Sequence, residues 1–194
     1  MIAFRGICVE GNVQPGQKVL INGAGGAAGS FAVQLAKLRG AEVTGVDHTD
    51  KLDFLRSLGA DHVIDYTSED FTRTGHRYHL VLDVIADRSV FAYARALLPG
   101  GSCLVVGGAV TVLLQCLTLG PLIRKSTSKR IRVLMVPQNR DDLASITELC
   151  EAGKVIPPID RTYPLSELPE ALRYVCEGRQ KGKVVVAVEA DSDT

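Results

Sequence analysis

The chain has 194 residues, enough for one complete domain and part of a second. Its 46% apolar and 23% charged residues are an ordinary globular composition, which excludes a disordered, collagen-like or coiled-coil chain. The 22 basic residues balance the 22 acidic ones, so the net charge does not support a nucleic-acid partner, although a local patch could be hidden in the total.

The five cysteines are widely spaced, odd in number and free of any Cys-x-x-Cys pair. This pattern predicts free thiols in a reducing compartment rather than disulfides or a zinc site. The N-terminus, Met1 to Gly6, lacks the charged and then apolar order of a secretion signal. We therefore expect an intracellular protein, cytoplasmic or organellar, that is not secreted and holds no metal.

Short apolar runs in the first two thirds of the chain predict six buried strands. They are Val19–Ile21, Val43–Val46, His62–Ile64, Leu80–Val84, Cys103–Val106 and Ile131–Val136. Their nearly continuous hydrophobicity indicates burial on both faces, which is typical of a parallel sheet covered by helices.

Helices are predicted between these strands from Ala28 onward, over Asp50–Leu58 and over Asp87–Leu98, the last two opening on an aspartate suited to capping or to the helix dipole. Glycines that can close the last helical turn follow the predicted helix ends at Gly40, Gly59, Gly100 and Gly153. The alternation predicts an α/β fold, a doubly wound (Rossmann) six-stranded parallel sheet with right-handed crossovers and helices on both faces.

The longest apolar stretch, Cys103 to Ile123, resembles a membrane span in composition. Gly107-Gly108, Gln115 and Gly120-Pro121 interrupt it, which favours a buried strand followed by an apolar helix. A peripheral membrane contact through Val110–Ile123 stays open at this point, and no closer membrane association is expected.

The pattern changes after residue 136. It predicts a helix over Arg140–Ala152, an extended segment over Ile159–Tyr163, a helix over Ser166–Glu177 and a strand over Lys183–Val188. We therefore expect two units, a dinucleotide-binding domain over 1–136 and a C-terminal α+β tail over 137–194.

A loop of small residues joins the first strand to the first long helix. Ala24, Gly26 and Gly29 form Ala-x-Gly-x-x-Gly, in which the three places serve a tight turn, close approach of a pyrophosphate, and close packing of helix on sheet. The helix N-terminus would offer N–H groups and a positive dipole end to phosphates. The alternative is simple strand-to-helix packing, but the loop's position in the first βαβ unit favours a nucleotide.

Asp47 ends the second strand, close to the spacing expected for a carboxylate that binds ribose hydroxyls. Such a group repels a 2′-phosphate, which favours NAD over NADP. Lys51 lies one helical turn further on and could reach a 2′-phosphate, and His48 could add a hydrogen bond. In the alternative interpretation, Asp47 or Asp50 only caps the next helix.

Several motifs together resemble the medium-chain dehydrogenase/reductase superfamily, and within it the zinc-independent quinone oxidoreductase branch. They are Gln14–Ile21, Gly23–Gly29, Ala32–Lys37, Leu58–Tyr66, Asp160–Leu165 and Gly182–Val185. The resemblance covers nearly the whole chain.

The resemblance implies a site for NAD(P)H. Its expected residues are Ala24, Gly25, Gly26, Ala27, Ala28 and Gly29 at the pyrophosphate, Asp47, His48, Lys51 and Tyr66 at the adenosine, and Val84, Ile85, Ala86, Gly107, Gly108 and Ala109 at the nicotinamide. The branch usually has glycine where Ala27 and Ala86 stand, so two methyl groups narrow the path of the pyrophosphate.

The resemblance also implies hydride transfer from the nicotinamide to a quinone or to the β-carbon of an enone. Members of the branch begin with a GroES-like catalytic domain, and we expect this chain to lack it. We therefore expect a fragment that binds the dinucleotide with weak or no turnover, and whose exposed apolar tail makes it a homo-oligomer or pairs it with another chain. No catalytic residue can be named.

Three other functions are alternatives to this one. A short-chain dehydrogenase needs Tyr-x-x-x-Lys, and no tyrosine of the chain has a lysine four residues on. A methyltransferase also uses a glycine loop and an acid like Asp47, but the end of the fourth strand, Leu82–Ala86, lacks the polar-aromatic cluster of amino-methylating members. A non-catalytic nucleotide-sensing or protein-interaction module stays open as the alternative.

Overall fold

The computed structural model describes residues 1–137 and 139–188. Six strands form one parallel sheet in the order β3-β2-β1-β4-β5-β6. They are β1 (Lys18–Asn22), β2 (Glu42–Asp47), β3 (His62–Asp65), β4 (Tyr78–Asp83), β5 (Leu97–Val105) and β6 (Arg130–Val133). This is the strand order of a dinucleotide-binding sheet, and the chain reverses its direction of winding between β1 and β4. The predicted fold class is confirmed.

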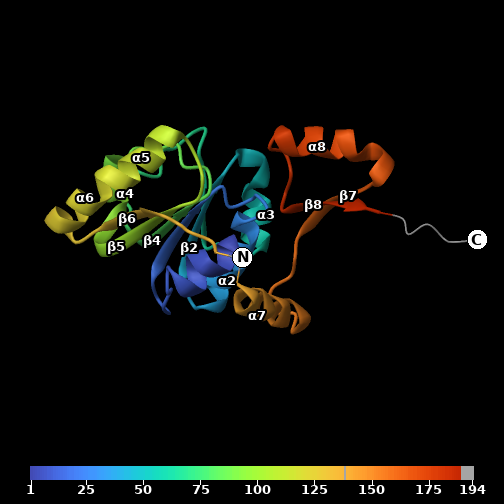
Figure 1. The fold of residues 1–194 in the computed structure, drawn as a ribbon, viewed down its shortest axis with the longest axis horizontal. Helices are drawn as coiled ribbons and strands as arrows, with labels where there is room; N and C mark the ends of the chain where they lie inside the picture. The colour runs from blue at the N-terminus through green and yellow to red at the C-terminus, as the bar shows by residue number, and fades with distance from the viewer. Residues whose placement is uncertain (138, 189–194) are drawn as a thin grey trace, which may run out of the picture.

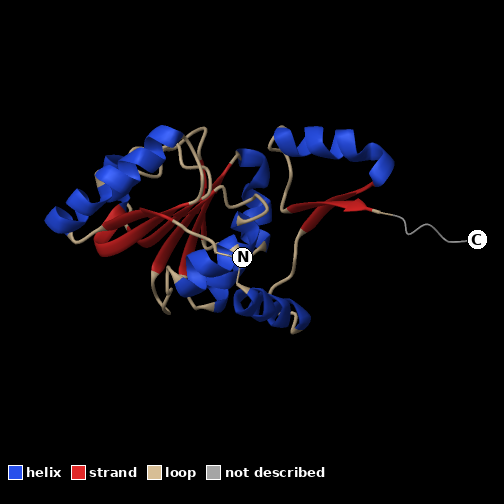
Figure 2. Ribbon diagram, in the orientation of Figure 1, coloured by secondary structure: helices blue, strands red, loops and turns tan. Residues whose placement is uncertain are grey.

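Helices cover both faces of the sheet (Figure 2). They are α1 (Ile2–Phe4) with the π-helical turn Arg5–Val9, α2 (Gly29–Leu38), α3 (Leu52–Ser57) after a short 3₁₀ turn at Thr49–Lys51, α4 (Val90–Ala96), α5 (Val110–Thr118), α6 (Gly120–Thr127) and α7 (Arg140–Glu151).

Two apolar cores lie on opposite faces of the sheet, because successive strand residues point in opposite directions. Val19 and Ile21 of β1 pack with residues of α1, α2 and α3, whereas Leu20 packs with Tyr93 of α4 and Ile123 of α6. Burial on both faces is the reason that the strands read as continuous apolar runs.

Both predicted ends of the helix before β5 are wrong. The helix predicted over Asp87–Leu98 begins only at Val90, because the Ser89 hydroxyl accepts a hydrogen bond from the Ala92 N–H at 3.3 Å and caps it. It ends at Ala96, since Pro99 disfavours helical geometry in the residue before it. Gly100 therefore lies inside β5 rather than after a helix end.

The predicted apolar helix after β5 is present as two shorter helices. The break falls at Leu119, and α6 begins at Gly120, where an added Cβ would lie 2.6 Å from the Ile131 carbonyl oxygen of β6. Pro121 lies in the first turn of α6, where its missing N–H costs no hydrogen bond. The predicted helix-closing glycines are confirmed at Gly40, Gly59 and Gly153, whose φ angles are +75°, +100° and +64°.

The C-terminal segment forms a separate parallel pair, β7 (Ile159–Pro164) and β8 (Lys183–Ala187), with α8 (Leu168–Cys176) between them. Figure 1 shows this pair at the opposite end of the molecule from α6. The part of the tail that precedes it packs on the large sheet: Val155 is buried in the core on the α2 side, and Arg5 pairs with Asp142 of α7 at 2.7 Å.

No helix within residues 1–137 and 139–188 is long and apolar enough to cross a membrane.

Candidate dinucleotide site

The loop after β1 turns at Gly23, whose φ is +76°. The N–H groups of Gly23 and Ala24 both donate to the Val46 carbonyl of β2, at 3.0 and 3.1 Å. The expectation that Ala24 makes the tight turn is therefore wrong, because a left-handed backbone favours glycine and Gly23 stands one residue earlier. Ala24 is instead buried in the core.

The two remaining glycine places have different surroundings. An added Cβ at Gly29 would collide with the Gly23 carbonyl oxygen, so this glycine permits close packing of α2 on the loop. At Gly26 the nearest atom to an added Cβ is that same oxygen at 3.5 Å, an ordinary contact. Gly26 lines a cleft, and the N-terminus of α2 lies beside it. Open space beside a glycine and a helix N-terminus fits a pyrophosphate.

The cleft has a volume of about 390 Å³ and lies at the carboxyl ends of β1, β2 and β4, where the strand order reverses. Eight of the predicted site residues line it: Gly26, Ala27, Ala28, Asp47, Lys51, Tyr66, Val84 and Ile85. The cleft is thus lined by some residues from each of the three predicted groups, those expected at the pyrophosphate, at the adenosine and at the nicotinamide.

The other eight predicted residues lie outside this lining. Ala24, Gly25 and Gly29 are buried within the loop, and His48 faces an adjoining hollow that it shares with Tyr66. Ala86 is buried, and Gly108 lies against it, so close that an added Cβ on Gly108 would collide with the Ala86 Cβ. Gly107 and Ala109 are exposed beyond this contact.

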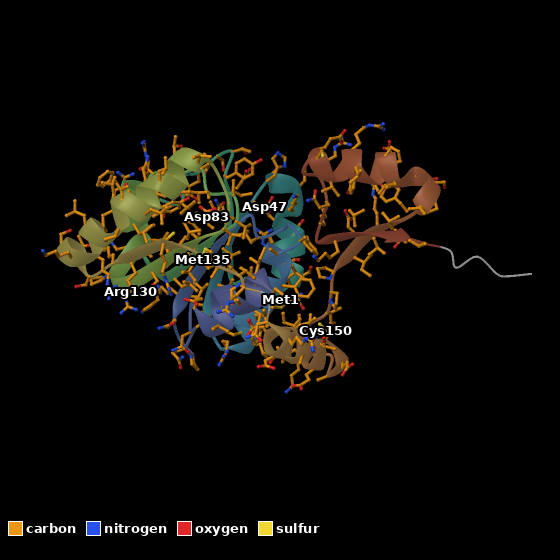
Figure 3. The ribbon with its side chains drawn as sticks, viewed as in Figure 1. Met1, Asp47, Asp83, Arg130, Met135 and Cys150 are labelled. Atoms are coloured by element: carbon orange, nitrogen blue, oxygen red, sulfur yellow. The ribbon has the colours of Figure 1, made fainter. Side chains whose placement is uncertain are left out.

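Asp47 is buried at the end of β2 and holds the glycine loop (Figure 3). Its Oδ2 accepts from the Gly25 N–H at 2.7 Å, and its Oδ1 accepts from the His48 N–H at 2.9 Å. The Lys51 Nζ lies 3.4 Å from Oδ1. The His48 ring, rather than Asp47, accepts from the Asp50 N–H and caps the following turn. The interpretation of Asp47 as a helix cap is therefore wrong.

Lys51 connects this carboxylate to the C-terminal segment. Its Nζ donates to the Gly178 carbonyl at 2.7 Å, and its side chain is buried. A second bond runs from the Gly182 N–H to the Gly25 carbonyl at 2.8 Å. The segment Gly178–Gly182, between α8 and β8, is thereby held at one end by Lys51 and at the other by the glycine loop.

Asp83 ends β4 at the opposite side of the cleft floor and is completely buried. It accepts from Asn22 at 2.9 Å and from the N–H groups of Ile85 and Ala86 at 2.9 and 2.7 Å. Burial raises the pKa of this carboxyl against the opposing effect of its hydrogen bonds. The network holds Ala86 at φ +56°, an uncommon conformation for alanine.

Six lining residues were not predicted: Asn22, Gly23, Asp87, Arg88, Gly178 and Gln180. Asn22 and Gly23 directly precede the predicted loop, so counting from the end of the strand would have found them. Asp87 and Arg88 follow Ala86 in the same turn. Gly178 and Gln180 come from the distant tail, and no local pattern marks them.

Within the described residues, no group of three histidine, cysteine, aspartate or glutamate side chains is placed to hold a metal ion.

A family model described as "Zinc-binding dehydrogenase" matches residues 58–186, about two thirds of the chain. The chain belongs to the medium-chain dehydrogenase/reductase superfamily. Among relatives of this superfamily, it is 34% identical to the mouse mitochondrial NAD(P)H oxidoreductase RTN4IP1, with 89% of this chain and 48% of that protein covered. It is 35% identical to a chloroplastic NADPH-dependent alkenal/one oxidoreductase of Arabidopsis thaliana, with 88% and 40% covered.

Solved medium-chain dehydrogenase/reductase structures share the fold. The quinone oxidoreductase of Coxiella burnetii superposes with a TM-score of 0.80 at 26% identity, over 97% of this chain and 57% of that one. The chain thus spans about half the length of the curated relatives and solved structures that it matches.

Proposed function

We propose that this chain binds a nicotinamide dinucleotide, NAD(P)H, and forms the cofactor-binding part of a quinone or enone oxidoreductase. The observation that carries the proposal is the cleft between β1 and β4, floored by a glycine loop in which Gly26 leaves room for a ligand. Relatives named as NAD(P)H and alkenal/one oxidoreductases support it.

Each side of the cleft has a role in this proposal. The backbone at Gly26 and the N-terminus of α2 bind the pyrophosphate, and the Ala27 and Ala28 methyl groups set the width of its path. Asp47, Lys51 and Tyr66 receive the adenosine ribose, with His48 at the edge. Val84 and Ile85 form an apolar wall that excludes water from the nicotinamide.

When bound, the cofactor supplies a hydride from its nicotinamide C4, which a quinone or the β-carbon of an enone accepts. The chain's own contribution is to bind and orient, which accounts for much of the rate in hydride transfer. In this proposal residues 1–136 supply the dinucleotide sheet and 137–194 supply a segment that closes over its edge.

We propose that NAD is favoured over NADP. The buried Asp47 carboxylate would lie against a 2′-phosphate, and like charges in such a setting repel strongly. Lys51, the cation that could compensate, is already paired with Asp47 and hydrogen-bonded to Gly178.

The proposal is tested by titrating the purified chain with NADH and with NADPH and following nucleotide fluorescence, then adding 9,10-phenanthrenequinone. Saturable binding, tighter for NADH, is the expected result. Absence of saturable binding of either nucleotide overturns the cofactor assignment. Binding without oxidation of the nucleotide supports a dinucleotide-binding chain that lacks turnover by itself, either as the fragment of an oxidoreductase or as the alternative, a nucleotide-sensing module.

A further inference from the structure

A second cavity, of about 380 Å³, lies between α1, α2 and α7. Figure 1 shows the N-terminus, α2 and α7 side by side at this place. The walls of the cavity are apolar side chains of these three helices, together with Ala27 and Ala28 of the glycine loop and Val155, which follows α7. A cavity of this size with mostly apolar walls is typical of a site for a small organic ligand.

The cavity has a floor and a rim. Ala3, Leu35 and Val155 line it and are at most 5% exposed, so they form its floor. Leu143 of α7 lines it as well and is 56% exposed, so it lies at the rim. A hollow with a buried floor, unlike a flat apolar face, can surround a ligand that enters with one end.

One charged side chain lines the cavity in the described part of the chain, that of Lys183 at the start of β8. Its ammonium lies 5.9 Å from the centre of the Phe31 ring, within reach of a cation–π interaction. Lys183 forms no ion pair with an acid of the described residues. Asp142, the neighbour of Leu143, is already paired with Arg5 at 2.7 Å. The cavity therefore combines apolar walls with a cation that has no counter-charge.

This combination decides between classes of ligand. A phosphate or a nucleotide would lose its hydration against apolar walls with a single cation to compensate, which is unfavourable. A wholly apolar ligand would fill the walls and leave the ammonium at the rim without a partner. A ligand with an apolar chain and one anionic end satisfies both parts of the cavity.

We propose that the cavity binds an amphipathic anion, a carboxylate with an unbranched apolar chain. The chain lies between α1, α2 and α7 and ends at the floor, against Ala3, Leu35 and Val155. The carboxylate meets the ammonium of Lys183 at the rim, where the side chain of this lysine is exposed. Apolar burial supplies most of the affinity, and the ion pair selects the charged end.

The cavity is distinct from the dinucleotide cleft. Ala27 and Ala28 line both spaces, and they are the two residues that the linings share in the described chain. The inference therefore does not rest on the proposed function. A chain that binds NADH and no carboxylate, or a carboxylate and no NADH, would separate the two proposals.

Isothermal titration calorimetry of the full chain with hexanoate, octanoate and decanoate tests the proposal. Each ligand is expected to bind saturably at one site, with an affinity that rises about fourfold for each methylene that the walls bury. The proposal is overturned if decanoate does not bind saturably, or if the affinity does not rise with chain length.

Lys183→Gln tests the cation. It is expected to lower the affinity for octanoate about fivefold and to leave the affinity for 1-octanol, an uncharged ligand with the same number of carbons, unchanged. Lys181→Gln, a matched loss of one exposed cation outside the lining, is expected to change neither affinity. An anionic ligand is ruled out if Lys183→Gln leaves the binding of octanoate unchanged or weakens that of both ligands equally.

Leu143→Asp tests the place of the site. It removes an apolar side chain from the rim and adds a negative charge there, so the affinity for octanoate should fall at least about tenfold. Leu114→Asp, the same change at a leucine of α5 that is 55% exposed, is the control and should leave it unchanged, and circular dichroism checks that both variants are folded. Equal effects of the two variants overturn the proposal. A wild-type dimer that Leu143→Asp alone converts to monomers overturns it as well, because the cavity would then belong to an interface between copies.

Discussion

The Tyr93 hydroxyl of α4 donates a hydrogen bond to Asp83 Oδ2 of β4 at 2.8 Å, and both side chains are completely buried. The other oxygen, Oδ1, accepts hydrogen bonds from the Asn22 side-chain amide and from the N–H groups of Ile85 and Ala86. One carboxylate therefore connects the end of β1, the turn after β4 and the helix that follows. The first two of these elements contribute residues to the lining of the cleft.

Removing the Tyr93 hydroxyl should weaken this connection. Tyr93→Phe leaves a buried carboxylate with one donor fewer, and a hydrogen bond to a charged group contributes about 1.5–3 kcal/mol. We expect the free energy of unfolding in urea to fall by about 2 kcal/mol. Tyr66→Phe, at an exposed tyrosine, is the matched control and should change it by less than about 0.5 kcal/mol. Equal effects of the two variants would contradict the role assigned to Asp83.

Asp83 should also give stability a pH dependence. Its folded pKa is raised above the ordinary 3.8, so the folded state binds the proton more tightly than the unfolded state. Its contribution is then most favourable at low pH and is lost as pH rises through the raised pKa. Asp83→Asn removes this contribution. The free energy of unfolding in urea is measured for the wild type and for Asp83→Asn from pH 7 down to about 4. The wild-type value minus the Asp83→Asn value should therefore become more positive as pH falls. A difference between the two proteins that does not vary with pH would contradict a raised pKa of Asp83 in the folded state.

Ala86 is strained at φ +56°, and glycine tolerates that conformation without cost. A left-handed conformation costs an alanine about 1–2 kcal/mol, of which the greater flexibility of unfolded glycine offsets part. Ala86→Gly is expected to raise the free energy of unfolding by about 0.5 kcal/mol. Ala92→Gly, inside α4, should lower it by about 1 kcal/mol. A loss of stability in both variants would show that the Ala86 methyl is needed for packing.

Gly26 and Gly29 should separate binding from folding. Gly26→Val adds atoms toward the cleft, where the folded chain has room, so dinucleotide affinity should fall at least about tenfold while stability changes by less than about 0.5 kcal/mol. Gly29→Ala forces a methyl against the Gly23 carbonyl and should destabilise the fold by about 2 kcal/mol. Fluorescence titration and thermal unfolding of both variants check this. Undiminished binding by Gly26→Val would place the pyrophosphate elsewhere.

Asp47→Ser should change cofactor preference. Removing the carboxylate relieves repulsion of a 2′-phosphate and releases Lys51 to meet it. We expect the affinity for NADPH relative to NADH to rise about tenfold, which corresponds to about 1.4 kcal/mol. The ratio of the two dissociation constants is the readout, because a looser glycine loop would weaken the binding of both nucleotides alike and leave that ratio unchanged. An unchanged ratio means that Asp47 serves only to hold Gly25.

The sheet could be predicted from the sequence because each strand is buried on both faces. A short apolar run such as Val43–Val46 is most simply interpreted as a buried strand, and all six predicted runs overlap strands of the structure. The bounds of α4 could not, because Ser89 competes with Asp87 as the cap at its start and Pro99 acts on the residue before it at its end. In the site, Asp47 was predictable by spacing from the loop. Gly178 and Gln180 were not, because they reach the cleft only through the path of the tail.

The fastening of Gly178–Gly182 to the glycine loop makes the tail a reporter of the cleft. The Gly182 amide is protected from hydrogen exchange only while it donates to Gly25, and the rate of that exchange measures how often the two separate. By reciprocal linkage, a ligand that binds more tightly with the segment in place must slow the exchange, and one that displaces it must hasten it. The hydrogen-exchange rate of one backbone amide, more than 150 residues along the chain from the loop that it contacts, thus indicates whether a ligand occupies the site.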